Sequence, residues 1–303
     1  MLVIGTDEAG YGPNLGPLVV SATAWSVPPK VDLTELGKTL REQGIDIADS
    51  KQLYHGGGSL KTLEHGVWIA HLSADKTKIS VEMDSDDPCW QDGFFDKLVA
   101  ETSWRDVHKL ADVLLSTLES VGVRLLRLRS FIVGAKSFNQ RLDACGSKGT
   151  LLSEVTLEIV RDFFTETPEY RLSDSEYRLN GGIVLCDKHG GRNRYLDILT
   201  RFFPDEFFLI VEESRPLSVY RSKELEFRFQ SKGESQLPVA LASMLSKYLR
   251  EISMLKFNAF WRSHLPDLKP TAGYPEDAKR FKADIAAVQA RLGISDNLIW
   301  RKK

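Results

Sequence analysis

The sequence predicts a single α/β domain, residues 1–303, in which helices flank a mixed central β-sheet. Three observations support this. The chain opens with two apolar, strand-like runs joined by a turn rich in Gly and Pro, which is typical of a hairpin. Further short apolar runs alternate with segments whose apolar residues recur every three or four positions, the period of an amphipathic helix. The sequence contains no internal repeat and no low-complexity tract, so one layered domain is expected.

In the first half of the chain, the hairpin precedes two amphipathic helices with strand between them. The expected elements are strands at 2–7 and 18–25, a helix at 104–120, one or two strands at 123–133 and a helix at 151–164. The stretch from 55 to 100 is polar and rich in Gly and Asp. We therefore expect this stretch to be an insertion or a small subdomain within the domain.

In the second half, three strands precede two helices. The expected elements are strands at 182–186, 206–212 and 225–229 and helices at 237–256 and 276–292. Pro238 falls in the first turn of the longer helix, where a missing N–H group costs nothing. Gly293 follows the last helix and marks its end.

Composition narrows the class of protein. Hydrophobic residues make up 42% and charged residues 27% of the chain, as in an ordinary globular protein, and no apolar run is long enough to span a bilayer. The three cysteines form no CxxC pair and no leader pattern opens the chain, so we expect a cytoplasmic protein without a membrane or an obligate protein partner. With a net charge of −2, binding to nucleic acid would need a local basic surface.

Four acidic residues stand at the ends of expected elements. Asp7 and Glu8 end the first strand, Asp187 ends a later strand, and Glu234 precedes the longest helix. Each has an ordinary explanation: an acidic strand end before a solvated turn, a helix N-cap, and a favourable place near the positive end of a helix. Neighbours on a regular strand point to opposite faces, so Asp7 and Glu8 share one cavity only if the strand bends, which Gly10 permits.

Taken together, the four acids form a pattern that folding alone does not require. Hard divalent cations such as Mg²⁺ are bound by carboxylates, water and phosphate oxygens. Two such ions about 4 Å apart activate the attacking water and stabilise the leaving oxygen in phosphodiester cleavage. Without metal, the mutual repulsion of the acids would raise the pKa of at least one of them.

Four segments resemble a known family. They are GTDEAGYGPNLGPLVVSA (5–22), ADSKQL (48–53), SKGESQLPVALASMLSKYLRE (231–251) and AGYP (272–275). The first is similar to the opening signature of ribonucleases HII and HIII, and the second to their Asp-Ser-Lys loop. The third is similar to their acid-then-helix segment and the fourth to their late Gly-Tyr-Pro. Because the segments occur in the family's order, the sequence resembles a divergent member of the type 2 ribonuclease H family.

The resemblance implies a ribonuclease H-like fold and an activity. The expected enzyme is an endoribonuclease that hydrolyses the RNA strand of an RNA–DNA hybrid duplex with Mg²⁺ or Mn²⁺, leaving 5′-phosphate and 3′-hydroxyl ends. The resemblance gives catalytic and metal-binding roles to Asp7, Glu8, Asp187 and Glu234. It also places Lys51 in a loop that faces the substrate.

Further substrate contacts are expected around the first turn and before the last helix. Backbone N–H groups of Gly10, Tyr11 and Gly12 could contact the substrate, and Tyr274 could stack on a sugar at the cleavage point. Other basic residues are expected mostly as solvated surface charges: Lys136, Lys148, Lys188, Arg192, Arg194 and Lys232. His189, beside Asp187, is expected at the surface.

The sequence departs from the family's pattern at three places. Tyr11 stands where HII enzymes carry an Arg, Glu234 stands where HII enzymes usually carry Asp, and the residues that follow Asp187, KHGGRNR, are not the usual continuation. Residues 138–160 resemble the HIII version of that region more closely. The chain is therefore expected to lie between the two types.

Two other functions are consistent with these residues. One is another ribonuclease H-like nuclease, such as a junction resolvase that prefers branched DNA. The other is a non-catalytic nucleic-acid-binding protein on the same fold, although the presence of all four acids argues against it. A nucleotide-binding module is disfavoured because the sequence has no GxxxxGK[ST] loop.

Overall fold

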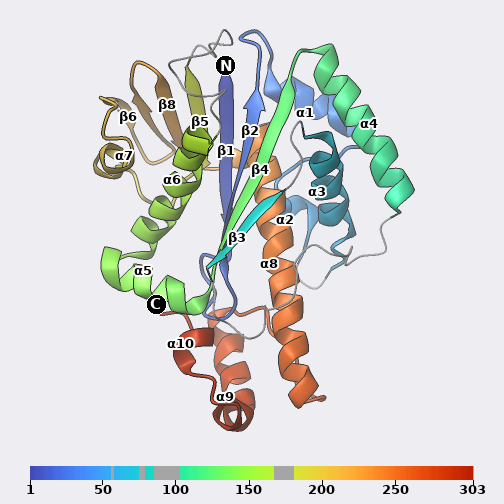
Figure 1. Cartoon of the computed structure of the whole chain (residues 1–303), viewed down its shortest axis with the longest axis vertical. Helices are drawn as coiled ribbons and strands as arrows, with labels where there is room; N and C mark the ends of the chain where they lie inside the picture. Colours follow the sequence, from blue (N-terminus) through green and yellow to red (C-terminus); the bar gives the residue numbers. More distant parts are fainter. Residues whose placement is uncertain (56–57, 75–78, 85–102, 167–180, 303) are drawn as a thin grey trace.

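A computed structural model describes residues 1–55, 58–74, 79–84, 103–166 and 181–302 (Figure 1). Within these ranges, eight strands form one sheet in the order β3-β4-β2-β1-β5-β8-β7-β6. Their bounds are β1 Leu2–Ala9, β2 Leu18–Ser26, β3 Ser80–Asp84, β4 Arg124–Val133, β5 Gly182–Asp187, β6 Leu209–Glu213, β7 Leu217–Arg221 and β8 Leu225–Gln230. The helices are α1 Leu33–Glu42, α2 Ser50–Leu53, α3 Lys61–Ser73, α4 Trp104–Ser120, α5 Ala135–Cys145, α6 Lys148–Glu166, α7 Leu196–Phe202, α8 Leu237–His264, α9 Pro275–Arg291 and α10 Asp296–Ile299, with a 3₁₀ helix, η3, at Gly233–Ser235.

The sheet is mixed, and β1 lies near its centre. The hairpin partner β2 runs antiparallel to both β1 and β4. On the other side of β1, strands β5 and β8 follow in parallel orientation, each paired with its neighbour. This mixed sheet with flanking helices confirms the predicted α/β fold class.

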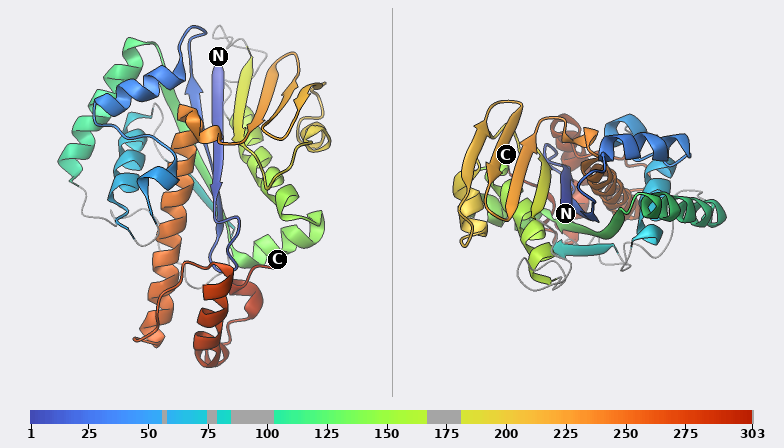
Figure 2. Two further views of the ribbon diagram at one scale, coloured as in Figure 1. Left: turned by 180° about the vertical axis from the view of Figure 1, so that it is seen from behind. Right: turned by 90° about the horizontal axis from the view of Figure 1, so that it is seen from above.

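Helices cover both faces of the sheet. The core on one face includes residues of α1, α3, α4 and α8, and the core on the other face includes residues of α5, α6 and α7. Figure 2 shows α8 in front of the sheet, whereas in Figure 1 α6 is in front. The alternation of side chains along β1 supplies both cores, since Leu2 and Ile4 enter one and Val3 enters the other. A third core joins the end of α8 to α9 and α10.

Helix α8 lies directly against β1, and Gly5 makes this approach possible. A Cβ at Gly5 would overlap the backbone of Pro238 in the first turn of α8. Thr23 of β2 donates a hydrogen bond to the carbonyl of Pro238 at 2.8 Å. The start of α8 is therefore held beside the carboxyl-terminal half of β1, where the acidic residues lie.

The expected elements are found with small changes in length. The stretch expected at 123–133 forms one strand, β4, from Arg124. The helix expected at 237–256 continues to His264 because its last turns pack against α9. The stretch 55–100 remains a predicted insertion. Its described part contains α3, which packs on α8, and β3, which pairs with β4, whereas 85–102 lie outside the described residues. Among the helices of the described part, none combines the length and the apolar character needed to cross a membrane.

Candidate functional site

Three of the predicted acids lie at the carboxyl ends of neighbouring parallel strands. Asp187 is the last residue of β5, and the register pairs it with Gln230, the last residue of β8. Thr6 of β1 pairs with Cys186, so Asp7 and Asp187 follow at the same level. Glu234 comes four residues after the end of β8, in η3. Because the carboxyl ends of adjacent parallel strands meet at one edge of a sheet, the fold brings these acids together.

Asp7 and Glu8 lie on a regular part of β1. Both residues pair with β2, and the chain turns sharply only after them, at Gly10, whose φ is +86°. The bend expected at this strand end therefore begins after Glu8. Both carboxyl groups nonetheless lie close to Asp187 and Glu234, whose charges raise the pKa of each, after the larger effect of burial. Asp7 accepts a hydrogen bond from Ser243 of α8, and Glu8 lies near enough to Tyr11 for its charge to raise the pKa of that phenol, after the larger effect of burial.

The acids repel one another strongly. Burial, with the charges of Asp187 and Glu234, raises the pKa of Asp7 to about 7, although hydrogen bonds from Ser243 and from the Glu8 N–H oppose this shift. Burial and the same neighbours hold the pKa of Glu8 well above its ordinary range. The pKa of Asp187 is also raised, by burial first and by Glu234 among the charges. A crowded set of carboxylates with raised pKa values is typical of a functional site that binds a positively charged ligand.

Lys51 supplies positive charge at this site. Its ammonium group donates to Oε1 of Glu234 at 3.1 Å, and its side chain is 78% exposed while that of Glu234 is 7% exposed. The short helix α2 that carries Lys51 is capped by Asp49, which accepts from the Lys51 N–H at 2.9 Å. Ser50 in the same helix lies 3.0 Å from Ser243 of α8, measured between the hydroxyl oxygens. Lys51 is therefore held beside the acids by α8.

A strained turn fixes Glu234 next to Asp187. Lys232 has φ +64°, the left-handed region, and is the sole non-glycine residue with positive φ in the described part of the chain. Such backbone strain is concentrated at functional sites. The turn brings the Gly233 N–H within 3.1 Å of Oδ1 of Asp187. The interpretation of Asp187 as a helix N-cap is wrong, because the next helix, α7, begins only at Leu196, with Tyr195 at the N-cap position.

The turn after β1 is packed from several sides. A Cβ at Gly10 would overlap the carbonyl of Pro17 and crowd the guanidinium of Arg250. The Tyr11 ring lies against Gly190, where a Cβ would overlap the phenol oxygen. Gly12 has open space around it, since no heavy atom lies within 4 Å of a Cβ built there. The turn therefore exposes backbone that a ligand can approach.

Arg250 lies near both Tyr274 and this turn. The Tyr274 side chain is exposed, and the guanidinium carbon of Arg250 lies 5.9 Å from its ring centroid. Arg250 also donates to the carbonyl of Ala272 at 2.7 Å. Arg250 thus lies beside Gly10 and also contacts the segment before α9. The structure therefore brings together the Gly10–Gly12 turn and the segment of Tyr274, the two regions predicted to contact substrate.

A cleft of about 990 Å³ opens beside Asp187 and Glu234. Its walls combine acidic, basic and amide side chains from four segments of the chain. They are Asp49, Lys51, Gln52, Asp187, Lys188, Gly191, Asn193, Arg215, Ser231, Lys232, Glu234 and Ser235. Arg215 was not predicted, because it stands in a turn between two strands without any pattern. Ser243, which contacts Asp7, was also missed, although the Ala/Ser-rich face of the α8 segment was a signal for it.

Two residues that follow Asp187 serve the fold. The Lys188 ammonium group is buried and donates to Asn193 at 2.9 Å, to the Ser214 carbonyl at 2.7 Å and to Ser218 at 2.9 Å. These bonds tie the end of β5 to the β6–β7 hairpin, so Lys188 is not a solvated surface charge as expected.

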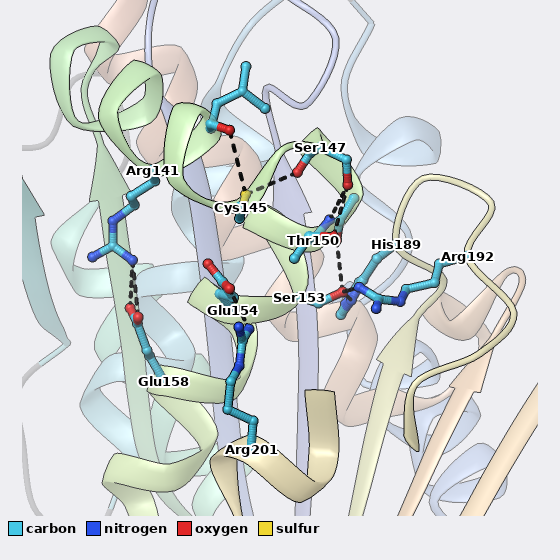
Figure 3. Close-up of polar contacts among 12 residues, drawn as sticks. Arg141, Cys145, Ser147, Thr150, Ser153, Glu154, Glu158, His189, Arg192 and Arg201 are labelled. Carbon is cyan, nitrogen blue, oxygen red and sulfur yellow. Dashed lines mark hydrogen bonds and ion pairs between the residues drawn. The ribbon is translucent and has the colours of Figure 1, made fainter. Parts of the chain in front are cut away.

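His189 is also buried, and the expectation that it lies at the surface is wrong. Its Nδ1 lies 2.9 Å from the Ser153 hydroxyl, with Arg192 beside it (Figure 3). Burial lowers the pKa of His189 to about 3, and the charge of Arg192 lowers it as well. The imidazole is therefore neutral near pH 7.

The chemistry of the acids fits a hard divalent cation. Within the described residues, however, no group of three or more His, Cys, Asp or Glu side chains is arranged to hold a metal ion. Mg²⁺ is usually bound by one or two carboxylates together with water and substrate phosphate, rather than by a complete protein cage. The donor set therefore fits an open site that substrate completes.

No protein-family model and no curated protein matches the sequence. Among solved structures, the chain is similar to the PCNA:RNase HII complex from Archaeoglobus fulgidus, with 18% identity, a TM-score of 0.47 and coverage of 100% of this chain and 95% of that one. It is also similar to ribonuclease H2 from Pyrococcus horikoshii, with 17% identity, a TM-score of 0.46 and coverage of 99% and 92%.

A third similar structure is Bst-RNase HIII in complex with Mn²⁺, with 14% identity, a TM-score of 0.44 and coverage of 99% of this chain and 66% of that one. At these identities, similarity concerns the fold. The three similar structures are of a ribonuclease HII, a ribonuclease H2 and a ribonuclease HIII.

Proposed function

We propose that the chain is a metal-dependent endoribonuclease that hydrolyses the RNA strand of RNA–DNA hybrids and leaves 5′-phosphate and 3′-hydroxyl ends. The observation that carries this proposal is the set of mutually repelling acids where three parallel strands end. The motif order in the sequence supports the hybrid substrate. Lys51, which the motifs assign to a substrate-facing loop, contacts this acid set.

Asp7, Glu8, Asp187 and Glu234 would hold Mg²⁺ or Mn²⁺. The bound metal would supply an activated water and positive charge at the leaving oxygen. Ser243 and the Gly233 N–H orient Asp7 and Asp187 by hydrogen bonds. Such bonds hold the carboxylates ready in one conformation.

The substrate is placed by residues on either side of the acids. Lys51 and Lys232 line the cleft and offer positive charge to phosphate groups. Backbone N–H groups at Gly10, Tyr11 and Gly12 and the exposed ring of Tyr274 would offer further contacts to sugar and phosphate. Contacts of this kind can distinguish RNA through its 2′-hydroxyl groups.

The test uses a uniformly labelled RNA–DNA hybrid and a four-way DNA junction, each with EDTA and with Mg²⁺. Hybrid cleavage with Mg²⁺ alone, and products whose 5′ ends carry phosphate, are expected. Asp7→Asn should abolish most of this activity. Asp143→Asn is the matched control, because Asp143 is an exposed acid that pairs with Lys302 away from the acidic set.

Two outcomes would replace the proposal. Cleavage of the junction without cleavage of the hybrid would identify another ribonuclease H-like nuclease. Binding of hybrid or junction without cleavage of either, in both Mg²⁺ and Mn²⁺, would identify a non-catalytic nucleic-acid-binding protein.

A further inference from the structure

Arg301 is a completely buried cation in the segment that follows α10, with 0% of its surface exposed. Its backbone N–H donates to the Asn14 carbonyl at 2.8 Å, and the Asn14 side chain donates back to the Arg301 carbonyl at 3.0 Å. Trp300 pairs with Leu15 by an isolated β-bridge. This late segment is therefore joined to the turn that follows β1.

The guanidinium of Arg301 reaches beneath that turn. One of its terminal nitrogens donates to the Gly10 carbonyl at 2.6 Å and also to the Pro13 carbonyl. The ring of Phe138 closes the other side, with its centroid 4.6 Å from the guanidinium carbon. One side chain thus bridges the two ends of the Gly10–Pro13 turn.

Burying this charge is costly. The Nε and the second terminal nitrogen of Arg301 have no hydrogen-bond partner, and within the described part of the chain no carboxylate pairs with it. A buried cation without a counter-ion carries a large desolvation penalty, and a neutral side chain of the same shape would avoid it. The arginine therefore works against stability unless its charge and its bridge serve the turn.

The turn itself presents donors away from Arg301. Within the described residues, the N–H groups of Tyr11 and Gly12 make no hydrogen bond to the protein. Their neighbouring carbonyls, at Gly10 and Pro13, are fixed on the guanidinium. Arg250 also lies beside Gly10, and its charge is paired with Glu251 at 3.3 Å. The buried guanidinium of Arg301 behind a turn with free N–H groups favours an anion in front of the turn.

We propose that Arg301 is a positioning residue for substrate binding, which holds the Gly10–Pro13 turn so that its N–H groups face a phosphate of the nucleic-acid duplex. This inference rests on the proposed function for the identity of the ligand. The hydrogen bonds from Arg301 to the Gly10 and Pro13 carbonyls do not depend on that function. Arg301 touches neither the acids nor the scissile bond, so it acts on binding rather than on the chemical step.

The experiment compares Arg301→Met, Arg301→Lys and Lys302→Met with the wild-type chain. Lys302→Met is the matched control, since Lys302 is the adjacent cation and pairs with the exposed Asp143. Amide hydrogen exchange of the peptide covering 10–16 reports the turn without any substrate. Binding of an RNA–DNA hybrid in EDTA, together with KM and kcat in Mg²⁺, shows whether the turn contributes to substrate binding.

Arg301→Met should speed exchange across 10–16 about tenfold or more, weaken hybrid binding and raise KM about tenfold, with kcat within about threefold of wild type. For Arg301→Lys, the exchange rate, hybrid affinity and KM should lie between those of the wild type and Arg301→Met, because an ammonium keeps the charge but lacks the planar set of donors. Lys302→Met should match the wild type. Unchanged exchange in Arg301→Met, or in Arg301→Lys should the methionine variant not fold, would overturn the proposal, as would a fall in kcat at constant KM. If the wild type binds no hybrid, the proposed function fails, while the exchange data still decide whether Arg301 holds the turn.

Discussion

The ammonium group of Lys51 lies 3.1 Å from a carboxylate oxygen of Glu234, which is 183 residues away in the chain. The charge of Lys51 also lowers the pKa of Glu8 and of Asp187, against the larger effect of burial. In the absence of metal, this lysine is thus a counter-ion to the acidic set. A divalent cation that binds Glu234 would compete with it.

This competition predicts opposite effects of Lys51→Met on metal and on substrate. Without the lysine, Glu234 has no competing cation, so Mn²⁺ should bind about 2–5-fold more tightly, since an exposed ion pair contributes up to about 1 kcal/mol. The same change should raise KM for the hybrid, because a phosphate contact is lost. Calorimetric titration with Mn²⁺ and steady-state kinetics measure the two effects. Lys38→Met, which removes an exposed lysine paired with Glu35, is the control. Weaker Mn²⁺ binding in Lys51→Met would contradict the competition.

Substitutions of the acids should separate ligands from bystanders. Asp7→Asn is expected to reduce the rate about 10²–10⁴-fold, or roughly 3–5 kcal/mol of transition-state stabilisation, because a metal ligand is lost. Asp187→Asn should be equally severe, since Asp187 belongs to the same acidic set. Both variants should keep the wild-type circular dichroism spectrum and bind Mn²⁺ more weakly. Normal turnover in either variant would remove that residue from the site.

The raised pKa of Asp7 predicts how stability depends on pH without metal. Its value of about 7 lies above the ordinary 3.8, so the folded chain binds this proton more tightly than the unfolded chain does. The free energy of unfolding should therefore decrease as pH rises from about 4 to 7, by at most about 1.4 kcal/mol per pH unit for one proton, and level off above. Mn²⁺ affinity should change in the opposite sense and increase over the same range.

Urea unfolding in EDTA at pH 5, 6, 7 and 8 measures this dependence. The side chain of Asn does not titrate, so the free energy of unfolding of Asp7→Asn should decrease less than that of the wild type as pH rises. The variant should therefore be more stable than the wild type at pH 8. Asp143→Asn should behave as the wild type. Equal pH dependence in Asp7→Asn and the wild type would show that the pKa of Asp7 is not raised by folding.

Tyr11 predicts a preference for runs of ribonucleotides over a single ribonucleotide in duplex DNA. Arg at this turn position would offer several fixed donors, whereas Tyr offers one hydroxyl, and here that hydroxyl lies against Gly190. Recognition of one RNA–DNA junction needs polar contacts around one 2′-hydroxyl, but a hybrid spreads recognition over several. The measurement is kcat/KM on duplexes with one and with four embedded ribonucleotides. Equal or better cleavage of the first would reject the preference, and an unchanged ratio in Tyr11→Arg would show that Tyr11 does not determine it.

Local patterns predicted most of the fold. The apolar runs that became β1, β2, β5 and β8 have strand length, and the periodicity of α4 and α8 spans several helical turns. The acids at the strand ends were visible because each interrupts an apolar run. The order of the strands depends on which strands pair, and the parallel pairing of β1 with β5 places Asp7 and Asp187 side by side at the same end of the sheet.

The residues that were missed depend on contacts between distant segments. No local pattern shows that Lys188 turns inward to three acceptors or that Arg301 lies under a turn 291 residues earlier. The left-handed conformation of Lys232 was equally hidden, because lysine has no preference for it. Such features arise only once the sheet and α8 are assembled.

The parallel pairing of β1 with β5 has a consequence for how the chain folds. Strand β1 finds its antiparallel partner within 26 residues, but its other edge stays open until residues 182–187 exist. At a synthesis rate of roughly 5–20 residues per second, that interval is on the order of ten seconds or more. During it, a newly made apolar strand has an unpaired edge, and pairing over such a sequence distance is slow. The rate of refolding from denaturant should therefore be limited by the pairing of β1 with β5. Aggregation during expression should depend on the rate of this pairing more than on the stability of the folded protein.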